Sequence, residues 1–599
     1  MKFNIMLFFL SIFSIFLSHA SEKEKIKIAF MPDVHFQDLK GNLLSGLTEP
    51  TENTVRTMSD QLISTRLFNE NYFAFRAALD DAVKNDSKLI VLNGDFSDDG
   101  QPYNLLGLKR ILDEYHHTHG VQFFLSPGNH DPTSPFGRPS SMKRLLTPSG
   151  ESIELISPER GKCKNLSEKV VCSEQAREAG YKELVEILGS YGFTPQPSYL
   201  HWETPFSSIK DNYSFDRMTN SDELLLSNRS FEICSIDGEA CAKVPDLSYL
   251  VEPVEGVWLL SIDANVFVPY YENGELRFQG ASNAGFNYVI EHKNKLIDWI
   301  VSVTKRAKLE GKKLITFSHY PMTGFYDGAD SEMHSLFGDK AHQLERSPLK
   351  STSEKLTQLG IRLHIGGHMH INDSMKYQSE NEWLINVQVP SLAAYIPAYK
   401  TATVNMQSDD ISFELNKVTE VSNFKALFPL YRKEAEKASK YNPELVWPIE
   451  ILESKSYLEF TKFHIRELSF NRFLNEWPND LRELLFLHSA QEILQLIGVD
   501  SIDDPMVDFS GRDLIVDYYK VRNAGYLAIE DIGLKQIDRY KHFYALASRL
   551  KKSHTNTQYK HLMLFLDIFN KIVEGDFCDR FTVNLTSGEF LKHCETIMY

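Results

Sequence analysis

The alternation of apolar and polar segments over the first 420 or so residues predicts an α/β fold. Five short apolar runs have the length and composition of buried strands: residues 26–30, 89–92, 123–125, 314–317 and 363–365. Between the first three runs, residues 69–84 and 103–117 carry apolar side chains at helical spacing. A strand, a helix and a second strand in this order favour parallel pairing, because parallel strands need a long crossover connection.

The same pattern continues towards the middle of the chain. Residues 257–262 form another strand-like run, and Leu296, Trp299, Ile300 and Val303 lie on one face of an expected helix. Two further apolar runs, at residues 383–389 and 402–406, follow the fifth strand. We therefore expect a second sheet that packs on the first.

Beyond about residue 422 the pattern becomes helical. Asp480 and Glu483 have the spacing of a capping box, and Gly498 offers a helix end. Apolar stripes within residues 540–547 and 562–569 are typical of core packing. We divide the chain into residues 21–421, an α/β domain, and residues 422–599, a helical C-terminal domain in which we expect no chemistry.

Residues 136–253 interrupt the α/β pattern. This insertion contains four of the six cysteines and several clusters of Ser, Pro and Asn. It is either a surface elaboration or a lid over one edge of the functional site, and its pattern does not separate the two.

The first 20 residues resemble a secretory signal. Lys2 provides the positive start, residues 5–17 are nearly all apolar, and residues 18–20 (SHA) suit a cleavage site. The alternative is an uncleaved membrane anchor, although the run is short for a membrane-spanning helix. We expect cleavage, no stable membrane span afterwards, and a secreted or periplasmic protein.

The cysteines are consistent with export. An even number of cysteines in an exported chain suggests disulfides, and six cysteines allow fifteen pairings. The shortest loops are closed by Cys163–Cys172, Cys234–Cys241 and Cys578–Cys594. A structural zinc site is a weaker interpretation, because the closely spaced cysteine pairs of such sites are missing.

The negative net charge of the chain argues against nucleic acids as partners. The formal net charge is -17, and no basic block of the kind that binds DNA or anionic lipid is visible. Such an acidic surface repels nucleic-acid backbones. A small substrate is therefore favoured over a nucleic acid.

Metal-binding residue types follow each of the first five strands. The stretches are DVH at 33–35, GD at 94–95, GNHD at 128–131, SH at 318–319 and GHMH at 367–370. Strands of an open α/β sheet bring the residues at their carboxyl ends to one rim. Carboxylates, a carboxamide and imidazoles together suit borderline or hard divalent cations. These residues are numerous enough for two adjacent metal ions.

This set resembles the calcineurin-like metallophosphoesterase superfamily, whose pattern is D-x-H, G-D-x-x, G-N-H-[DE], H and G-H-x-H in this order. All five blocks lie within residues 26–372. The resemblance implies a four-layer α/β/β/α sandwich with two metal ions at the rim of the sheet. The block spacing and the export signal are also similar to secreted bacterial class III cyclic-nucleotide phosphodiesterases. The insertion and the helical extension depart from a minimal member of that type.

The resemblance also implies a role for each matching residue. Asp33, His35 and His370 would bind the first metal, Asn129, His319 and His368 the second, and Asp95 would bridge them. His130 is similar to the residue that stabilises or protonates the leaving oxygen, with Asp131 orienting its ring; the alternative for His130 is a purely structural role. The cations would be Fe, Mn or Zn, and the sequence does not choose between them.

The implied reaction is hydrolysis of a phosphodiester, with cyclic nucleotides as candidates, by attack of a metal-bridging hydroxide. One alternative is a phosphomonoesterase, nucleotidase or phospholipid-headgroup hydrolase on the same centre. Another is a non-catalytic, metal-stabilised binding protein, in which we would expect a broken block. No block is broken in this chain.

Overall fold

The computed structural model describes residues 25–41, 43, 54–140, 143–159, 163, 169–208, 213–283, 285–379, 382–441, 447–499, 504–550, 556–575 and 578–593. The expected signal at residues 1–20 lies outside these ranges. Within them, no helix combines the length and the apolar character needed to cross a bilayer.

Two seven-stranded sheets form the centre of the molecule. The first has the strand order β21-β20-β19-β18-β1-β2-β3, and the second has the order β16-β17-β15-β14-β11-β10-β7. In the second sheet, β16 spans Asp373–Ser379, β10 spans Tyr249–Val254 and β7 spans His201–Glu203. The strands that precede the predicted ligands are β1 (Lys25–Phe30), β2 (Leu89–Asn93), β3 (Gln122–Ser126), β14 (Lys313–Ser318) and β15 (Leu363–Gly366). β1, β2 and β3 pair in parallel, as do β14 and β15. The predicted strands are confirmed, but they belong to two sheets rather than one.

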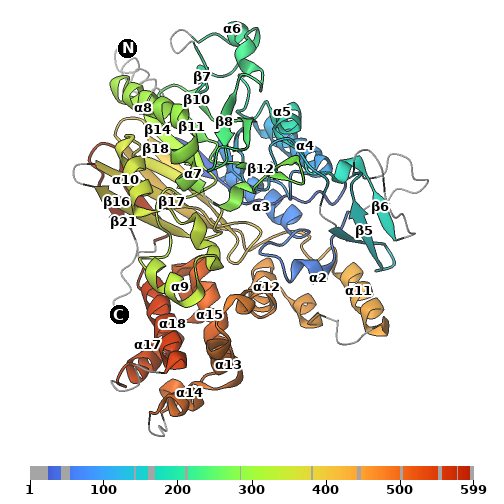
Figure 1. The fold of residues 1–599 in the computed structure, drawn as a ribbon, viewed down its shortest axis with the longest axis vertical. Coiled ribbons are helices and arrows are strands. Elements are labelled where there is room, and N and C mark those ends of the chain that lie inside the picture. Colours follow the sequence, from blue (N-terminus) through green and yellow to red (C-terminus); the bar gives the residue numbers. More distant parts are fainter. Residues whose placement is uncertain are drawn as a thin grey trace, which may run out of the picture.

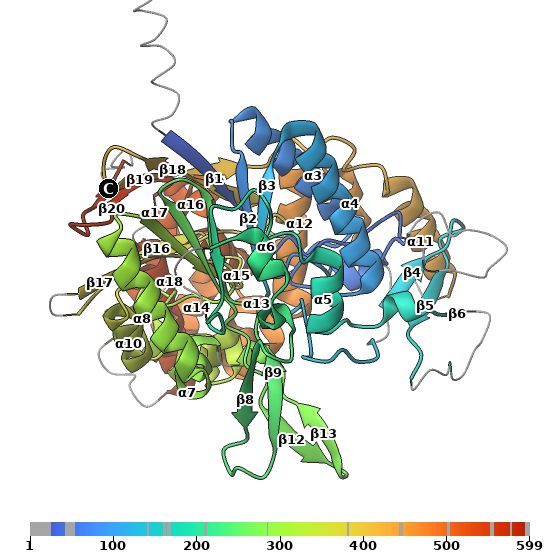
Figure 2. The ribbon, with the colours of Figure 1, turned by 90° about the horizontal axis from the view of Figure 1, so that it is seen from above.

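Helices cover the outer face of each sheet. α3 (Asn71–Lys84) and α4 (Pro102–His119) lie outside the first sheet, and α8 (Asn294–Leu309) and α10 (Lys350–Gln358) lie outside the second (Figures 1 and 2). The two sheets also bond directly to each other, since the Tyr249 hydroxyl donates to the backbone carbonyl of Leu125 at 2.9 Å. The expected four-layer α/β arrangement with a helical C-terminal region is confirmed.

The second sheet contains two of the three other predicted strands. β11 spans Val257–Ile262 and lies beside β14, while β17 (Glu382–Gln388) pairs with β15. β18 (Ala398–Asn405) instead joins the first sheet, where it pairs antiparallel with β1. The two apolar runs near residues 385 and 404 thus belong to different sheets, a distinction that periodicity alone cannot make.

The helical region has its own core. Its helices include α11 (Phe428–Tyr441), α12 (Tyr457–Asn471), α13 (Asn479–Leu487), α14 (Ala490–Ile497), α15 (Gly511–Ala524), α16 (Tyr526–Ile532), α17 (Leu534–Ala547) and α18 (Thr557–Val573). α13 to α18 lie together at one end of the molecule (Figure 1). Their buried side chains form one apolar cluster with those of α9 (Asp330–Phe337), which attaches the helices to the α/β part.

Two details of this region differ from the sequence-based expectation. The capping box is formed by Ser489 and Glu492 at the start of α14, because Asp480 lies inside α13. Gly498 does end a helix, with a left-handed φ of 102°. The region is also not wholly helical. β20 (Arg580–Asn584) pairs with β19 (Asp410–Lys417), and β21 (Phe590–Lys592) pairs with β20, so both strands extend the first sheet.

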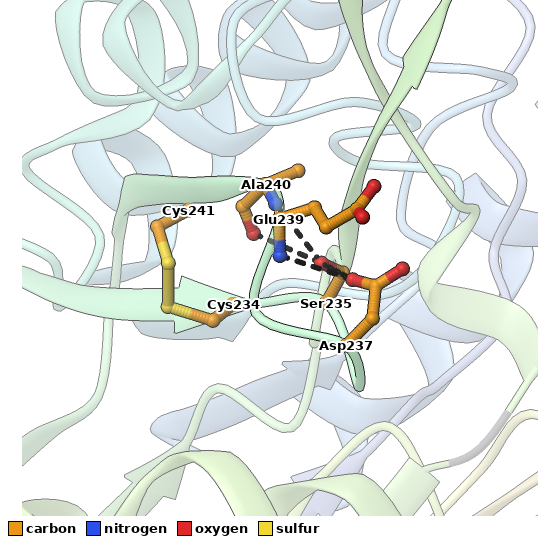
Figure 3. The surroundings of a disulfide bond; sticks show 6 residues. All are labelled: Cys234, Ser235, Asp237, Glu239, Ala240 and Cys241. Carbon is orange, nitrogen blue, oxygen red and sulfur yellow. Dashed lines mark hydrogen bonds between the residues drawn. A yellow bond between two sulfur atoms is a disulfide. The ribbon is translucent and has the colours of Figure 1, made fainter.

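Two of the three expected disulfides are present. Cys163 pairs with Cys172, and Cys234 pairs with Cys241. The latter closes the end of a hairpin formed by β8 (Ser230–Cys234) and β9 (Cys241–Pro245), whose turn is held by hydrogen bonds of Ser235 (Figure 3). Cys594, the expected partner of Cys578, lies outside the described residues.

A buried carboxyl group links the α/β part to α11. Glu70, at the start of α3, accepts a hydrogen bond of 2.7 Å from the hydroxyl of Tyr431. The side chain of Glu70 is completely buried, and its second oxygen has no hydrogen-bond partner among the described residues. Burial raises the pKa of Glu70 to about 7, against the lowering effect of the hydrogen bond from Tyr431.

This link predicts a stability that depends on pH. A carboxyl group whose pKa is raised on folding contributes stability below its unfolded pKa of 4.5, and this contribution is lost as the pH rises through about 7. Between about pH 4.5 and pH 8, the free energy of unfolding of the wild type should therefore fall by up to about 3 kcal/mol relative to Glu70→Gln. Urea denaturation of both proteins across this range measures the difference; parallel curves would contradict it.

Candidate metal centre

All seven predicted metal ligands lie together at the carboxyl ends of five strands. Asp33 and His35 follow β1, Asp95 follows β2, and Asn129 follows β3. His319 follows β14, and His368 and His370 follow β15. The site is therefore assembled where the rims of both sheets meet. A backbone contact holds this junction, because the amide of His368 donates to the Asp33 carboxylate at 2.8 Å.

The ligand atoms fall into two groups. The first contains Asp33, His35 and His370, and the second contains Asp95, His319 and His368; within each group the ligand atoms lie within 4.8 Å of one another. The first group contains the three residues predicted for one metal, and the second contains Asp95 with two of the three residues predicted for the other. Asn129 belongs with the second, since its side-chain oxygen lies 3.2 Å from Nε2 of His319.

Asp95 lies between the two groups. Its Oδ2 is 3.1 Å from Nε2 of His319 in one group and 3.8 Å from Nε2 of His35 in the other. Its Oδ1 accepts a hydrogen bond of 2.8 Å from the backbone amide of His130. One oxygen is thus oriented by the protein, and the other faces both groups, which is the arrangement a bridging carboxylate requires.

The loops that carry the ligands are bent into left-handed backbone conformations. Asp33, His35, Asp95, His368 and His370 have φ values of 52°, 43°, 49°, 69° and 56°. Such values are uncommon for residues other than glycine, and they cluster at functional sites where the surrounding structure holds them. The tight turns after the strands direct these short side chains back to one point.

Glycine next to a ligand makes room for another ligand. Gly94 has φ 92°, and a Cβ atom on it would lie 2.3 Å from Nδ1 of His319. A Cβ on Gly128 would lie 2.2 Å from Oδ1 of Asp95. At these two positions the glycine is required by the approach of a ligand, which explains its place in the sequence blocks.

The polar atoms of the centre fit two divalent cations. Oδ1 of Asp33 is buried and has no hydrogen-bond partner in the described part of the chain. Burial lowers the pKa of His319, but the Asp95 carboxylate more than offsets this and brings it to about 9. Burial and Arg66 hold the pKa of His35 well below its usual value. A centre of unpaired carboxylate oxygen and crowded imidazoles lacks the compensation that bound cations would provide.

His130 lies at the edge of this centre. Its ring centroid is 5.1 Å from that of His35, and its side chain is partly exposed. His130, His35 and Asp95 form a third group with ligand atoms within 4.8 Å of one another. Nδ1 of His130 lies 2.5 Å from Oδ1 of Asp99, so Nε2 is the ring nitrogen that remains available for another contact.

Asp99, not Asp131, orients the ring of His130. The predicted role of Asp131 is wrong, because Asp131 accepts hydrogen bonds from the backbone amides of Ser97 at 3.0 Å and Gly128 at 3.1 Å. It holds two ligand-bearing loops together instead. Burial raises the pKa of Asp131 well above its usual value, and the nearby Asp95 adds to this effect.

Asp99 belongs to a charged network that the sequence blocks do not reveal. Lys143 donates to Asp98 and lies 2.7 Å from Asp99, and Arg66 contacts the same two carboxylates. Asp98 and Asp99 directly follow the second block, which is the only sequence feature that could have indicated them. Lys143 and Arg66 come from distant segments with no recognisable motif.

The centre opens into a cavity of about 470 Å³. Besides the residues of the metal centre, the α/β part contributes residues 280–282, Lys340, His342, Gln343, Glu345 and Arg346, and the helical region contributes Arg472, Phe473, Glu476, Arg522 and Asn523. Of the insertion at residues 136–253, Arg138 reaches the cavity. The helical region, in which we expected no chemistry, thus forms part of the cavity wall.

One of the comparisons with known proteins, a family match, agrees with the geometry. Residues 26–229 match the family model described as Calcineurin-like phosphoesterase. Among solved structures, a dimetal phosphatase from Danio rerio matches with 12% identity and a TM-score of 0.27, over 66% of this chain and 96% of that chain. A search of curated proteins finds no match. The family match includes the segments that carry Asp33, His35, Asp95 and Asn129, and it supports a metal-dependent phosphoric ester hydrolase.

The approach of Gly94 to His319 predicts a selective loss of metal. Gly94→Ala places a Cβ atom against the His319 ring, so we expect bound Fe, Mn or Zn, measured by plasma mass spectrometry, to fall by more than half. Gly120→Ala is the matched control, because Gly120 also has a left-handed φ of 67° but no atom lies within 4 Å of its Cβ position. The control should lose about 1–2 kcal/mol of stability and keep its metal. Equal metal content in both variants would contradict the prediction.

Proposed function

We propose that this protein is an exported phosphodiesterase that uses two divalent cations, with Fe, Mn and Zn as candidates. The observation that carries the proposal is the position of Asp95 between the two ligand groups. Cations bound there would supply charge to polarise a phosphoryl group and would lower the pKa of a bound water molecule.

The chain's own residues would bind the first cation, bind the second cation and bridge the two. Asp33, His35 and His370 form one ligand set, Asn129, His319 and His368 form the other, and Asp95 joins them. Hydrogen bonds between the ligand-bearing loops, such as that from the His368 amide to the Asp33 carboxylate, hold this geometry. Positioning of this kind is a large part of phosphoryl-transfer catalysis.

His130 would act on the leaving oxygen. Its Nδ1 faces Asp99, which leaves Nε2 as the atom that can donate a proton towards the cavity. The contact with the Asp99 carboxylate fixes the orientation of the ring. A general acid is of greatest use when the leaving group is a poorly stabilised alkoxide, as in an alkyl phosphodiester.

Export is supported by the two disulfides, because such bonds persist in oxidising compartments. Cyclic nucleotides remain candidate substrates within the phosphodiester class. A monoesterase or nucleotidase on the same centre is the alternative that the assay below must separate.

The assay uses the purified chain with added Mn, Fe, Zn or Mg. Its substrates are bis-p-nitrophenyl phosphate, p-nitrophenyl phosphate, and 2′,3′- and 3′,5′-cyclic nucleotides. We expect the diesters to be cleaved with a higher kcat/KM than the monoester. Asp95→Ala and His319→Ala should each lower kcat by at least about a thousandfold, because each removes part of the metal centre. Hydrolysis that survives both substitutions would rule out the two-metal centre.

The contact between Asp99 and His130 generates a separate prediction. Asp99→Asn should lower kcat by about tenfold to a hundredfold and leave the metal content unchanged, because it replaces the carboxylate that orients the His130 ring. Asp131→Asn is the comparison, and its main effect should be a lower thermal midpoint, since Asp131 bonds to loop amides. If Asp131→Asn reduces kcat at an unchanged midpoint while Asp99→Asn does not, the assignment of Asp99 is wrong.

A further inference from the structure

Arginine side chains line the cavity beside the metal centre, and they differ in how their charge is balanced. Arg66 lies 2.8 Å from the Asp98 carboxylate, and Arg138 lies 2.6 Å from that of Glu178. Arg346, Arg472 and Arg522 also line the cavity and form no ion pair with a carboxylate within the described ranges. These three arginines are therefore the part of the wall whose positive charge is not balanced by a paired carboxylate.

Arg522 is the most unusual of the three, because its side chain is buried, whereas Arg346 is partly exposed and Arg472 is exposed. Only 8% of Arg522 is exposed, and its Nε has no hydrogen-bond partner among the residues described. Its Nη1 donates to Oδ1 of Asn523 at 3.1 Å, and its Nη2 donates to the hydroxyl of Tyr326 at 3.0 Å. Neutral acceptors satisfy part of the guanidinium but do not compensate its charge, and a buried charge without a counter-ion is costly.

The neighbours of Arg522 fix it in place. Tyr326 receives the bond from Arg522 and itself donates to the backbone carbonyl of His342. The His342 ring is buried, stacks on Tyr519, and leaves its Nε2 without a partner in the described chain. Burial and the charge of Arg522 lower the pKa of His342 well below its usual value. These contacts hold the Arg522 guanidinium and the His342 ring in the cavity wall.

Arg346 connects this wall to the metal centre. Its Nη1 lies 3.0 Å from Nε2 of His368, one of the proposed ligands. Arg346 and Arg522 both line the same cavity, and both act on the hydroxyl of Tyr326 electrostatically. The positive wall thus runs from the ligand His368 to helix α15 of the C-terminal region.

We propose that Arg522, together with Arg346 and His342, forms a subsite for a second anionic group, and that the substrate is a phosphodiester that carries a further phosphate which is not hydrolysed. This inference rests on the proposed function and narrows its substrate class. A guanidinium binds a phosphate through two parallel N–H groups, and Arg522 retains unused donors for such a contact. A diester with a cationic headgroup would place like charges together, so the headgroup alternative is disfavoured.

The test compares two dinucleotides that differ by one phosphate. Dithymidine monophosphate contains a single internal diester, and its 5′-phosphorylated form adds one terminal phosphate. Cleavage of the internal diester is measured by chromatography of the products. For the wild type we expect kcat/KM to be about tenfold to a hundredfold higher for the dinucleotide with the terminal phosphate. Arg522→Gln should bring this ratio close to one, and Arg522→Lys should give an intermediate ratio, because lysine keeps the charge but loses the planar fork.

Arg512→Gln is the matched control. Arg512 lies on the same helix α15, is exposed, and does not line the cavity. This variant should keep the wild-type ratio for the two dinucleotides. Thermal midpoints of all variants show whether a lost ratio reflects unfolding, and Arg522→Lys provides the second measurement if Arg522→Gln does not fold.

The possible failures are distinguishable. A wild-type ratio near one, or a ratio unchanged in folded Arg522→Gln, overturns the subsite while the phosphodiesterase function stands. If the wild type hydrolyses neither dinucleotide nor bis-p-nitrophenyl phosphate, the proposed function fails. The subsite is then judged by calorimetry, where thymidine 3′,5′-bisphosphate should bind the wild type at least about tenfold more tightly than Arg522→Gln does; equal affinities overturn it.

Discussion

The position of one carboxylate governs the arrangement of the whole centre. Asp95 is held by the amide of His130 through one oxygen and faces both ligand groups with the other. It comes from the first sheet, whereas His319 comes from the second. Two cations close together repel each other, so a shared anion is required between them. For Asp95 to face both ligand groups, the rims of the two sheets must meet and the backbone at Asp95 must turn sharply.

The cost of this geometry is distributed over the surrounding loops. Five ligand residues adopt left-handed backbone conformations, and Gly94 leaves space where the His319 ring passes. Asp131 then ties two of the loops together through backbone amides. Strain of this kind persists only where the neighbouring structure over-determines it. The buried sheets provide that support, which is why the functional residues follow strands rather than occupy long free loops.

The helical region has two roles in this structure. It extends the first sheet at one edge through β20 and β21, and it supplies Arg522, Arg472 and Phe473 to the cavity. The candidate metal ligands therefore lie in the α/β part, whereas residues of both parts line the cavity beside them. The positive wall is notable in a chain with a formal net charge of -17. A local cluster of cations can bind a phosphate although the overall charge is negative, because short-range contacts are little screened in a partly buried cavity.

The sequence by itself determined the strands, the ligand types and their order. Asp33, His35, Asp95 and His319 could be predicted as candidates because each lies within a few residues of the end of an apolar run, and a strand end constrains where the following side chains lie. Only the tertiary structure decided that the strands divide into two sheets, that Asp99 rather than Asp131 faces His130, and that Arg522 reaches the cavity. The physical reason is distance along the chain. Local periodicity records which face of an element is buried, whereas contacts between residues hundreds of positions apart depend on how whole elements pack.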